Sequence, residues 1–350
     1  MAGGGTGGHV IPALAVAREL KQRGHEAFFV GTERGVEARM VPAAGFELEL
    51  IHIGGLKRVS IKQTLATLAQ LPVSTVQMIK LLHEKRAAAV FSMGGYVAGP
   101  PVAAALVRGT PVVVMEPNAV PGFTNRRIGR LVTRALVSFP ETSRYFPQGR
   151  TEVTGLPVRE EFFTLFPKAH ESVFTLLVTG GSQGSRTLNR AARASWPLFR
   201  QSRFPIRFIL QTGTASFEEL QKEFAATGLE GEVRPFIDDM PAAFAAADLI
   251  VCRSGAGAVA ELAAAGKPSV LVPFPYAADD HQLHNAQAFE RVGAAKVVVD
   301  REWSGEKLLE IVTALAADGA ALDRMGLQAR GFAQPGAARR AAEILEQTAR

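Results

Sequence analysis

Two glycine-rich turns in the chain are suited to binding phosphate groups. The first is Gly3–Gly8, and the second is Thr179–Ser185, which follows the apolar run Val173–Val178. A pattern typical of a helix comes after each turn. Glycines let the backbone approach a phosphate closely, and the first N–H groups of the following helix can bind it. Ser182 adds a hydroxyl donor, so the second turn predicts the opening βα unit of a nucleotide-binding fold.

His9 follows the first turn, at the start of the predicted helix. The amino end of a helix favours the neutral imidazole, which can accept a proton. His9 is therefore a candidate general base. The alternative is that it only orients the glycine turn, because a place in a motif does not fix a role.

Four further loops combine glycine with polar residues at the ends of predicted strands. They are Gly94–Pro101, Glu116–Gly122, Arg253–Ala256 and Asp279–Gln282. Ligands of open parallel sheets bind beyond the carboxyl ends of the strands, so we expect these loops to converge on one site. Each loop taken alone is explained more simply as a turn, because Gly, Pro, Asp and Asn are common turn residues.

Two charged residues are candidates for nucleotide binding. Glu261 lies about two turns into the helix predicted after Arg253–Ala256, where a carboxylate could accept hydrogen bonds from ribose hydroxyls. A solvated position on the helix surface is the alternative. Arg159 lies just beyond the predicted joint between two domains, and its planar cation could bind a diphosphate or simply be exposed.

Other chemistries lack the residues that they need. No Walker A motif occurs, and no D-x-D or H-x-x-x-H cluster marks a metal site. Asp279–His281 could hold a cation in principle, but a hydrogen-bonded loop is the simpler interpretation. The single cysteine, Cys252, excludes a disulfide framework and a cysteine-based zinc site.

The elements that must position these residues alternate between short β-branched runs and helical patterns. This alternation indicates an α/β fold with a parallel sheet in each half. We therefore expect two Rossmann-like domains, 1–157 and 158–350, with a joint near Gly155–Val158, a ligand in the cleft between them and a last helix that packs back on the first domain. The predicted strands are Ala27–Gly31, Ala88–Ser92, Pro111–Glu116, Ala135–Ser138, Ile206–Gln211, Leu249–Cys252, Ser269–Pro273 and Lys296–Val299.

The first glycine turn has little chain in front of it. Only Met1 and Ala2 precede the turn, although a G-x-G-x-x-G pattern normally follows a β-strand. We therefore expect the first strand of the N-terminal domain to be missing, through a misassigned start or a truncation. That strand is normally central in a doubly wound sheet.

The composition is that of a globular protein with a basic N-terminal half. The 350 residues are 47% hydrophobic and 21% charged, and residues 1–150 hold 18 Lys and Arg against 9 Glu and no Asp, a net charge of +9. This charge favours an anionic partner, or else a solvated basic surface. No aromatic-rich strand of the RNA-binding type occurs, so nucleic acid is not expected. No apolar run of 18 residues is present, and we do not expect a secretory signal.

Eight motifs in one order resemble the MurG family, the N-acetylglucosaminyltransferases of peptidoglycan synthesis. They span essentially the whole chain, and together they are far more specific than a single glycine turn. The motifs are Gly4–Val10, Met93–Val97, Glu116–Asn118, Gly155–Arg159, Gly180–Gly184, Phe236–Met240, Val251–Ala256 and Asp280–Asn285.

The resemblance implies a GT-B fold, in which two Rossmann-like domains face each other across a cleft. It implies inverting transfer of N-acetylglucosamine from UDP-N-acetylglucosamine to the 4-hydroxyl of the N-acetylmuramoyl unit of undecaprenyl-pyrophosphate-linked lipid I, which gives lipid II with a β-1,4 bond. No metal or other cofactor is expected, since this family needs none. The resemblance also implies a peripheral enzyme on the cytoplasmic face of the bacterial cell membrane.

Carried over position by position, the resemblance assigns the donor to the C-terminal domain and the acceptor to the N-terminal domain. Arg159 and Ser182 would contact the diphosphate, and the backbone of Ile237 would meet uracil. Glu261 would bind the ribose hydroxyls, and Gln282 would hold the sugar. The nucleotide would be lined by Ala256, Gly257, Ala258, Val259 and Ala260. The acceptor would face Thr6, Gly7, Gly8, His9, Tyr96 and Asn118, with His9 as the candidate base.

The chain departs from the family pattern at Met115–Asn118, where the family has His-Glu-Gln-Asn. A helper role for the first or third position is therefore not carried over. The amphipathic stretch Leu65–Arg86 lacks a Trp or Phe that could anchor it in a bilayer, so either a membrane patch or a core-facing helix explains it. The membrane interpretation uses the cations Lys57, Arg58, Lys80, Lys85 and Arg86, whereas the core interpretation uses the apolar Leu71, Val76, Ile79 and Leu82.

Three rival functions remain open from the residues alone. An NAD-dependent oxidoreductase needs an acidic residue about 20 residues beyond the glycine turn, and only Glu33 stands near the end of the run Ala27–Gly31. A sugar-nucleotide epimerase, or a transferase with another lipid acceptor, would share the two-domain architecture. A non-catalytic nucleotide-sugar binder is the third alternative, should the N-terminal domain be impaired.

Overall fold

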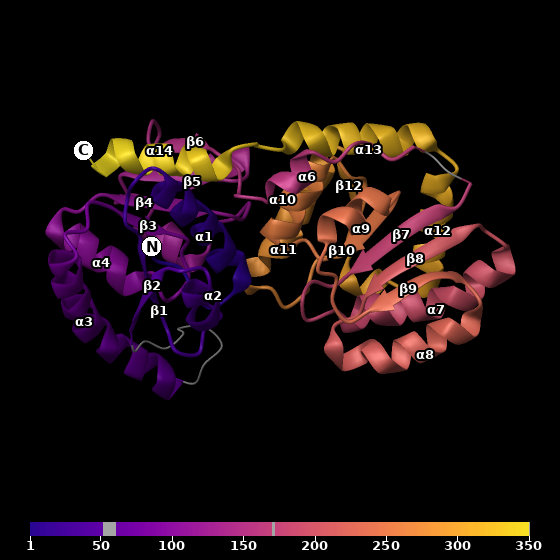
Figure 1. The fold of residues 1–350 in the computed structure, drawn as a ribbon, viewed down its shortest axis with the longest axis horizontal. Coiled ribbons are helices and arrows are strands. Elements are labelled where there is room, and N and C mark those ends of the chain that lie inside the picture. The colour runs from indigo at the N-terminus through magenta and orange to yellow at the C-terminus, as the bar shows by residue number, and fades with distance from the viewer. Residues whose placement is uncertain (52–60, 170–171, 350) are drawn as a thin grey trace. The chain divides into compact units, whose positions relative to one another are not determined.

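The structure is a computed structural model that describes residues 1–51, 61–169 and 172–349, with only the backbone described over 61–69. The chain divides into two compact units (Figure 1). Unit 1 holds Met1–Val158 and Gly336–Arg350, and unit 2 holds Arg159–Pro335. The expectation of an α/β fold is confirmed, because every strand pair in both units is parallel.

Unit 2 is built on six parallel strands. The strands are β7 (Phe174–Thr179), β8 (Ile206–Gln211), β9 (Glu230–Arg234), β10 (Leu249–Cys252), β11 (Ser269–Leu271) and β12 (Ala295–Val297). The helices are α6 (Glu160–Phe163), α7 (Arg186–Ser202), α8 (Phe217–Thr227), α9 (Met240–Ala246), α10 (Ala256–Ala265), α11 (His281–Arg291), α12 (Gly305–Ala316) and α13 (Gly319–Phe332). The order across the sheet is β12-β11-β10-β7-β8-β9. This is the strand order of the doubly wound nucleotide-binding fold, with β7 as the first strand.

The core of unit 2 fixes the carboxyl ends of these strands. All six residues of β7 are buried. Aromatic rings fill the space between sheet and helices: Phe199 meets Phe208 edge to face with ring centroids 5.5 Å apart, and Trp196 meets Phe224 in the same way at 5.2 Å. The loops that leave the strands therefore start from a rigid sheet.

Unit 1 has a parallel sheet of similar design. The strands are β1 (Phe28–Gly31), β2 (Glu47–Leu50), β3 (Val90–Ser92), β4 (Val112–Glu116), β5 (Arg134–Val137) and β6 (Thr151–Val153). The helices are α1 (Gly7–Gln22), α2 (Glu37–Ala43), α3 (Ile61–Glu84), α4 (Gly99–Arg108), α5 (Phe123–Ile128) and α14 (Ala337–Ala349). In Figure 1 the last helix, α14, lies beside α1, and α3 lies beside α4.

The sheet of unit 1 has two parts that a single residue joins. One part has the order β2-β1 and the other β3-β4-β5-β6. Ala2 forms an isolated parallel bridge to Val30 of β1 and another to Ser92 of β3. The position of the first strand in the doubly wound order is therefore taken by Met1 and Ala2.

Three strands were not expected from the sequence, namely β2, β6 and β9. Each lies at the edge of its sheet. Glu47–Leu50 alternates acidic and apolar residues, and none of its four residues is buried. Edge strands bury little surface and can carry charge, so they lack the apolar run that marks a central parallel strand.

Candidate functional site

The glycine turn of unit 2 follows β7 and leads into α7. Ser185 caps the helix, its hydroxyl accepting the N–H of Leu188 at 3.4 Å. Gly184 has a φ of +72°, and a Cβ there would lie 1.9 Å from the carbonyl oxygen of Thr212. Glycine is required at this position because the backbone of the next loop approaches so closely. Ser182 stands exposed at the tip of the turn, where its hydroxyl can meet a ligand.

Gln211, at the end of β8, ties this turn to the loop that carries Ile237. Its side-chain Nε2 donates to the carbonyl of Gly181 at 2.8 Å, and its Oε1 accepts the N–H of Ile237 at 3.0 Å. The N–H of Ile237 is thus engaged, which leaves the carbonyl oxygen as the backbone group that can meet a base. No local pattern marks Gln211 in the sequence, because both of its partners are distant along the chain.

The start of α10 offers a second set of backbone donors. Gly255 is the N-cap, no side chain caps the helix, and the N–H groups of Ala256, Gly257 and Ala258 lie in its first turn. The first N–H groups of a helix have no carbonyl partner within it, so they can bind an anion. Val259 is buried in the core at 1% exposure, so it can line a ligand only through its backbone.

Hydrogen bonds join the loops before α10 and α11. The buried hydroxyl of Ser254 donates to the carbonyl of Gln282 at 2.8 Å, and the amide of Asn285 donates to the carbonyl of Ser254 at 3.2 Å. The Oε1 of Gln282 accepts the N–H of Phe274 at 3.0 Å, which fixes the direction of the Gln282 amide. Ser254 and Asn285 belong to the motifs quoted above, and they hold Gln282 in place.

Arg159 and Glu261 are brought into one neighbourhood of unit 2. Burial raises the pKa of Glu261 to about 7, and the positive charge of Arg159 opposes that rise. The Arg159 guanidinium also stacks over the ring of Phe162, 5.0 Å from its centroid. Arg253 is committed elsewhere, to an ion pair with Asp300 and to backbone carbonyls after β11. Unit 2 therefore holds a half-buried carboxylate and an exposed cation in addition to the helix starts of α7 and α10.

In unit 1 the first glycine turn precedes α1, and it presents His9. The ring nitrogen Nδ1 of His9 lies 3.2 Å from the carbonyl oxygen of Gly4. A carbonyl oxygen only accepts, so Nδ1 is the donor in this contact. A Cβ on Gly95 would lie 3.4 Å from the His9 ring, and one on Gly5 would lie 3.4 Å from the Tyr96 ring. His9 and Tyr96 therefore stand at the same turn.

The side chain of Glu37 supports this turn by hydrogen bonding, and the sequence alone did not indicate this role. The carboxylate is 1% exposed. It accepts the N–H of Gly5 at 2.8 Å, and both the N–H and the hydroxyl of Thr32 at 3.0 Å. A Cβ on Gly4 would lie 2.5 Å from this carboxylate, and one on Gly35 would lie 2.0 Å from it. The only available signal was an acidic residue in the first turn of a helix that follows a strand and a Gly-Thr pair.

Glu116 organises the loop that carries Asn118. It is buried at the end of β4, where it accepts the backbone N–H of Asn118 at 2.9 Å and the amide of Asn125 at 2.8 Å. Burial raises its pKa to about 7, against the effect of these hydrogen bonds. Met115, which stands where the family has His, is wholly buried in the strand. Thr6 and Gly8 are exposed and Gly7 is half-buried at the start of α1.

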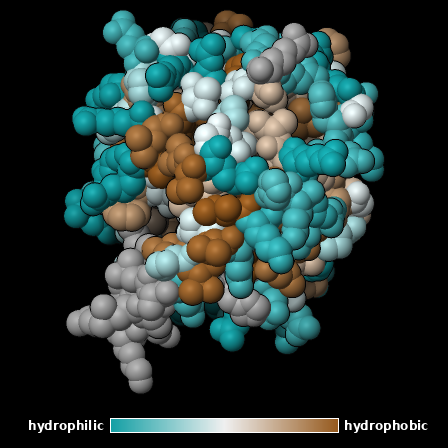
Figure 2. All heavy atoms as spheres, turned by 90° about the vertical axis from the view of Figure 1, so that its left-hand side faces the viewer, coloured by the Kyte–Doolittle hydropathy of each residue, from teal (hydrophilic) through white to brown (hydrophobic). Residues whose placement is uncertain are grey.

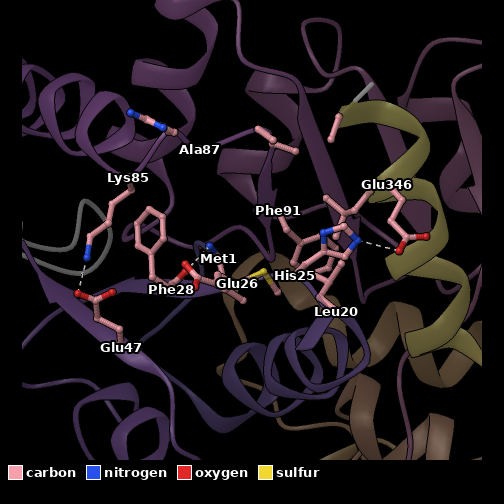
Figure 3. A pocket seen from close by; sticks show the side chains of 16 residues that line it. Met1, Leu20, His25, Glu26, Phe28, Glu47, Lys85, Ala87, Phe91 and Glu346 are labelled. Carbon is pink, nitrogen blue, oxygen red and sulfur yellow. Dashed lines mark hydrogen bonds and ion pairs between the residues drawn. The ribbon is translucent and has the colours of Figure 1, made fainter. Parts of the chain in front are cut away.

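Among the described residues, two cavities are lined by residues other than these. One, of about 360 Å³, lies in unit 1 and is lined by residues that include Met1, Phe28 and Phe91 (Figure 3). The other, of about 440 Å³, lies in unit 2 and is lined by residues that include Lys168 and Lys267. In the part of the chain that the structure describes, no group of three or more His, Cys, Asp or Glu residues could hold a metal ion.

Comparison with known proteins gives consistent matches over the whole chain. Models of the glycosyltransferase family 28 N-terminal and C-terminal domains match residues 1–137 and 175–344. A protein of Solibacter usitatus (strain Ellin6076) is 68% identical over 350 residues, covering 100% of this chain and 96% of its own length. It is named UDP-N-acetylglucosamine--N-acetylmuramyl-(pentapeptide) pyrophosphoryl-undecaprenol N-acetylglucosamine transferase. A protein of the same name from Myxococcus xanthus (strain DK1622) is 39% identical and covers 98% of this chain and 91% of its own.

A solved structure agrees with these sequence matches. The crystal structure of Acinetobacter baumannii MurG superposes with a TM-score of 0.85 at 34% identity, covering 98% of this chain and 97% of that one. The expected GT-B fold and the expected family are thereby confirmed.

Proposed function

The chain belongs to glycosyltransferase family 28, and from that premise we propose how its two units divide one reaction. The reaction is the transfer of N-acetylglucosamine from UDP-N-acetylglucosamine to the N-acetylmuramoyl unit of lipid I, which gives lipid II. The observation that carries it is the 68% identity to a transferase of this name along the full chain. In our proposal, unit 2 binds the donor, and unit 1 binds the acceptor and removes its proton.

In unit 2 the diphosphate is bound by backbone donors and one cation. The turn with Ser182 and the first turn of α10 each present helix N–H groups, and Arg159 adds a positive charge. These groups meet the charge that develops on the departing UDP. The proposal thus needs no metal ion to neutralise the leaving group.

The nucleoside and the sugar use the neighbouring residues. The carbonyl of Ile237 accepts a hydrogen bond from uracil, since Gln211 already takes its N–H. The ionised carboxylate of Glu261 accepts from the ribose hydroxyls. Gln282, whose amide is fixed by the N–H of Phe274, donates to the sugar through its remaining N–H groups. The backbone of 256–260 lines the nucleotide.

In unit 1, His9 is the general base. The acceptor 4-hydroxyl transfers its proton to Nε2 while its oxygen forms a bond to the anomeric carbon, and the bond from that carbon to the UDP oxygen breaks with the electron pair. Attack opposite the leaving group inverts the configuration. The Nδ1–H bond to Gly4 stabilises the imidazolium that forms. Thr6, Gly7, Gly8, Tyr96 and Asn118 form the surface that receives the acceptor and its pyrophosphate.

The test of this function is a reconstitution of the reaction. Purified protein is incubated with UDP-N-acetylglucosamine and a short-chain lipid I analogue, and the disaccharide product is measured by mass spectrometry. We expect a product that depends on both substrates. Conversion of UDP-N-acetylglucosamine without an acceptor would instead identify an epimerase, and UDP binding without turnover would identify a nucleotide-sugar binder.

We further propose that unit 1 carries the enzyme to the cytoplasmic face of an anionic membrane. Figure 2 shows hydrophobic side chains on the face of unit 1 to which α3 and α4 belong. Val76 on α3 is 65% exposed, and Val107 on α4 is 73% exposed. Leu82 is buried instead. One face of the amphipathic stretch therefore packs in the core of unit 1, whereas another face is exposed. No helix among the described residues is long and apolar enough to cross a bilayer.

The cations near this face contribute less than the net charge suggests. Lys80 pairs with Glu84, and Lys85 pairs with Glu47. Lys57 and Arg58 lie outside the described residues. We therefore assign the binding mainly to apolar contact, with charge as a second contribution.

Liposome flotation tests the membrane proposal. Replacing Val76 and Val107 by Ser should reduce recovery with anionic liposomes, whereas the control Leu327→Ser, at a residue of unit 2 that is also 70% exposed, should not. Raising the salt concentration should weaken binding only in part. If the Val76 and Val107 variant is recovered with the liposomes as fully as the Leu327→Ser control, the proposed membrane face is contradicted.

A further inference from the structure

Arg330, on α13, holds its guanidinium against the carboxyl end of α10. The two helices pack together in unit 2 (Figure 1). Nη1 of Arg330 donates to the carbonyl of Ala264 at 2.7 Å, and Nη2 donates to the carbonyl of Ala265 at 3.1 Å. These are the last two carbonyls of α10, and the last carbonyls of a helix have no N–H partner within it. Arg330 therefore completes the end of α10 from another helix.

The α10 helix has no cation of its own for this end. Its ten residues, 256–265, include no Lys, Arg or His. Lys267 follows the helix, but its ammonium donates to the carbonyls of Ala245 and Ala247 at the end of α9, at 3.2 and 2.9 Å. A positive charge at the carboxyl end of a helix is favourable because it faces the negative end of the helix dipole. Arg330 supplies that charge.

Two glycines allow α13 to come this close. Gly266, the C-cap of α10, has a φ of +60°, and a Cβ there would lie 2.8 Å from Nε of Arg330. A Cβ on Gly326, one turn before Arg330, would lie 2.8 Å from the carbonyl oxygen of Gly266. A side chain at either position would push α13 away from α10. Both glycines therefore serve the contact that the guanidinium makes.

The same guanidinium also holds the end of α6 and the segment after it. Nη1 donates to the carbonyl of Phe163 at 3.0 Å, and Nη2 donates to the carbonyl of Leu165 at 2.7 Å. Each terminal nitrogen of Arg330 thus joins one carbonyl of α10 to one carbonyl of this part of the chain. A guanidinium presents its donors in a rigid planar fork, whereas a lysine has three donors on one nitrogen. A lysine could therefore not make all four bonds.

The two elements that Arg330 joins carry residues of the proposed donor site. Arg159 is the N-cap of α6, and its charge lowers the pKa of Glu261 on α10. A helix as short as α6 is not stable by itself, so its position depends on tertiary contacts. Phe162 provides one of them, because it is fully buried and meets the ring of Phe244 with centroids 5.0 Å apart. Arg330 provides another.

We propose that Arg330 is a positioning residue of the donor site. By fastening α6 to the carboxyl end of α10, it fixes the guanidinium of Arg159 relative to the amino end of α10, where the diphosphate binds. This inference rests on the proposed function of unit 2. Arg330 lies at the opposite end of α10 from those N–H groups, so it acts on the donor through Arg159. Residues 262–265 of α10 are buried, whereas Arg159 is exposed, so loss of the fork displaces Arg159 and leaves α10 in place.

The variant Arg330→Lys tests the proposal, because it keeps the charge and removes the fork. UDP affinity is measured by calorimetry, and the affinity for uridine, which lacks the diphosphate, by NMR titration. We expect UDP binding to weaken by roughly fivefold and uridine binding to stay unchanged. The matched control is Arg324→Lys, on the same helix, where the arginine forms an exposed ion pair with Asp318. It should change neither affinity.

A double-mutant cycle separates positioning from a general structural role. In an Arg159→Ala background, Arg330→Lys should cause no further loss of UDP affinity, because the residue that it positions is gone. Independent, additive losses would overturn the proposal, and so would wild-type UDP affinity in either single variant. An equal loss of UDP and uridine affinity in Arg330→Lys would also overturn it, since the whole site would then be affected.

Two further measurements keep these outcomes distinct. Thermal melting shows whether Arg330→Lys is folded. If it does not melt cooperatively, Gly326→Ala takes its place in the same comparison, because it leaves Arg330 present and forces α13 away from α10. Product formation by the wild-type protein tests the proposed function separately. A wild type that makes product while Arg330→Lys binds UDP normally would overturn the role of Arg330 and leave the proposed function standing.

Discussion

The two sheets differ most at the position of their first strand. In unit 2 this position is β7, which pairs with β8 along its whole length and with β10 over its last four residues, and which is buried at all six residues. In unit 1 the same position, between β1 and β3, is held by Met1 and Ala2. Yet a glycine turn and a helix follow in both units. The same local motif is therefore supported in two different ways.

The comparison shows what each glycine turn depends on. The turn of unit 2 extends from a long buried strand, and Gln211 adds a neutral hydrogen bond to it. The turn of unit 1 is held by the carboxylate of Glu37, which accepts the N–H of Gly5. Charge-assisted hydrogen bonds of this kind are roughly twice as strong as neutral ones. The turn that carries His9 is thus more sensitive to one side chain than the turn that carries Ser182.

The largest effect expected from a single substitution is in unit 1. His9→Ala should lower turnover by roughly 100-fold or more, because the acceptor hydroxyl loses its general base. UDP affinity, measured by calorimetry, should stay within twofold of wild type. If acceptor affinity falls while the single-turnover rate is preserved, His9 is a binding residue and not the base.

A smaller effect, on binding alone, is expected in unit 2. Glu261→Ala should weaken UDP binding by about 2 kcal/mol, since the carboxylate's hydrogen bonds to ribose are lost. This corresponds to roughly 30-fold in Kd. Calorimetry with UDP, and with uracil as a control ligand that lacks ribose, measures the difference. Unchanged UDP affinity would remove Glu261 from the donor site.

Substituting the residue that supports each turn, Glu37 in unit 1 and Gln211 in unit 2, sharpens the comparison. Glu37→Gln puts an amide N–H where a carboxylate oxygen accepts, so turnover should fall by roughly tenfold with UDP affinity unchanged. Gln211→Ala should have the reverse pattern, with weaker UDP binding and a near-normal rate at saturating donor. Steady-state kinetics separates the two through kcat and KM. Loss of UDP affinity in Glu37→Gln would contradict the assignment of this turn to the acceptor.

The smallest effect is a pH dependence of donor binding. The pKa of Glu261 lies near 7, and ribose binding favours the ionised carboxylate. Binding therefore releases a proton, and UDP affinity should rise by roughly fivefold between pH 6 and pH 8 and then level off. Glu261→Gln controls for the ionisation of UDP itself. A profile that Glu261→Gln leaves unchanged would show that this carboxylate does not titrate on binding.

Much of the fold could be predicted because parallel strands in a sheet interior have a strong sequence signature. The predicted bounds Ile206–Gln211 and Leu249–Cys252 agree with β8 and β10 to the residue, since both segments consist mainly of aliphatic, β-branched or aromatic residues. The edge strands β2, β6 and β9 could not be predicted in this way, because charged residues interrupt the apolar residues in each of them. The pattern of apolar residues along a chain indicates which segments are buried, but it does not indicate which strand an edge strand pairs with.

The candidate site shows the same limit at the level of single residues. His9, Ser182 and Gln282 could be named because they stand in recognisable motifs. Glu37 and Gln211 could not, because what makes them important is a contact across the fold with Gly5 or Ile237. Such supporting residues depend on tertiary geometry, which one sequence does not contain.

The central claim, that unit 2 binds the donor and unit 1 removes the proton, is tested most directly by single-turnover kinetics. His9→Ala and Glu261→Ala are each mixed with UDP-N-acetylglucosamine and a short-chain lipid I analogue over a range of both concentrations. The account predicts that Glu261→Ala approaches the wild-type rate at saturating donor, whereas His9→Ala stays slow at every concentration. Recovery of His9→Ala at high substrate, or a slow step in Glu261→Ala that saturation does not relieve, would contradict it.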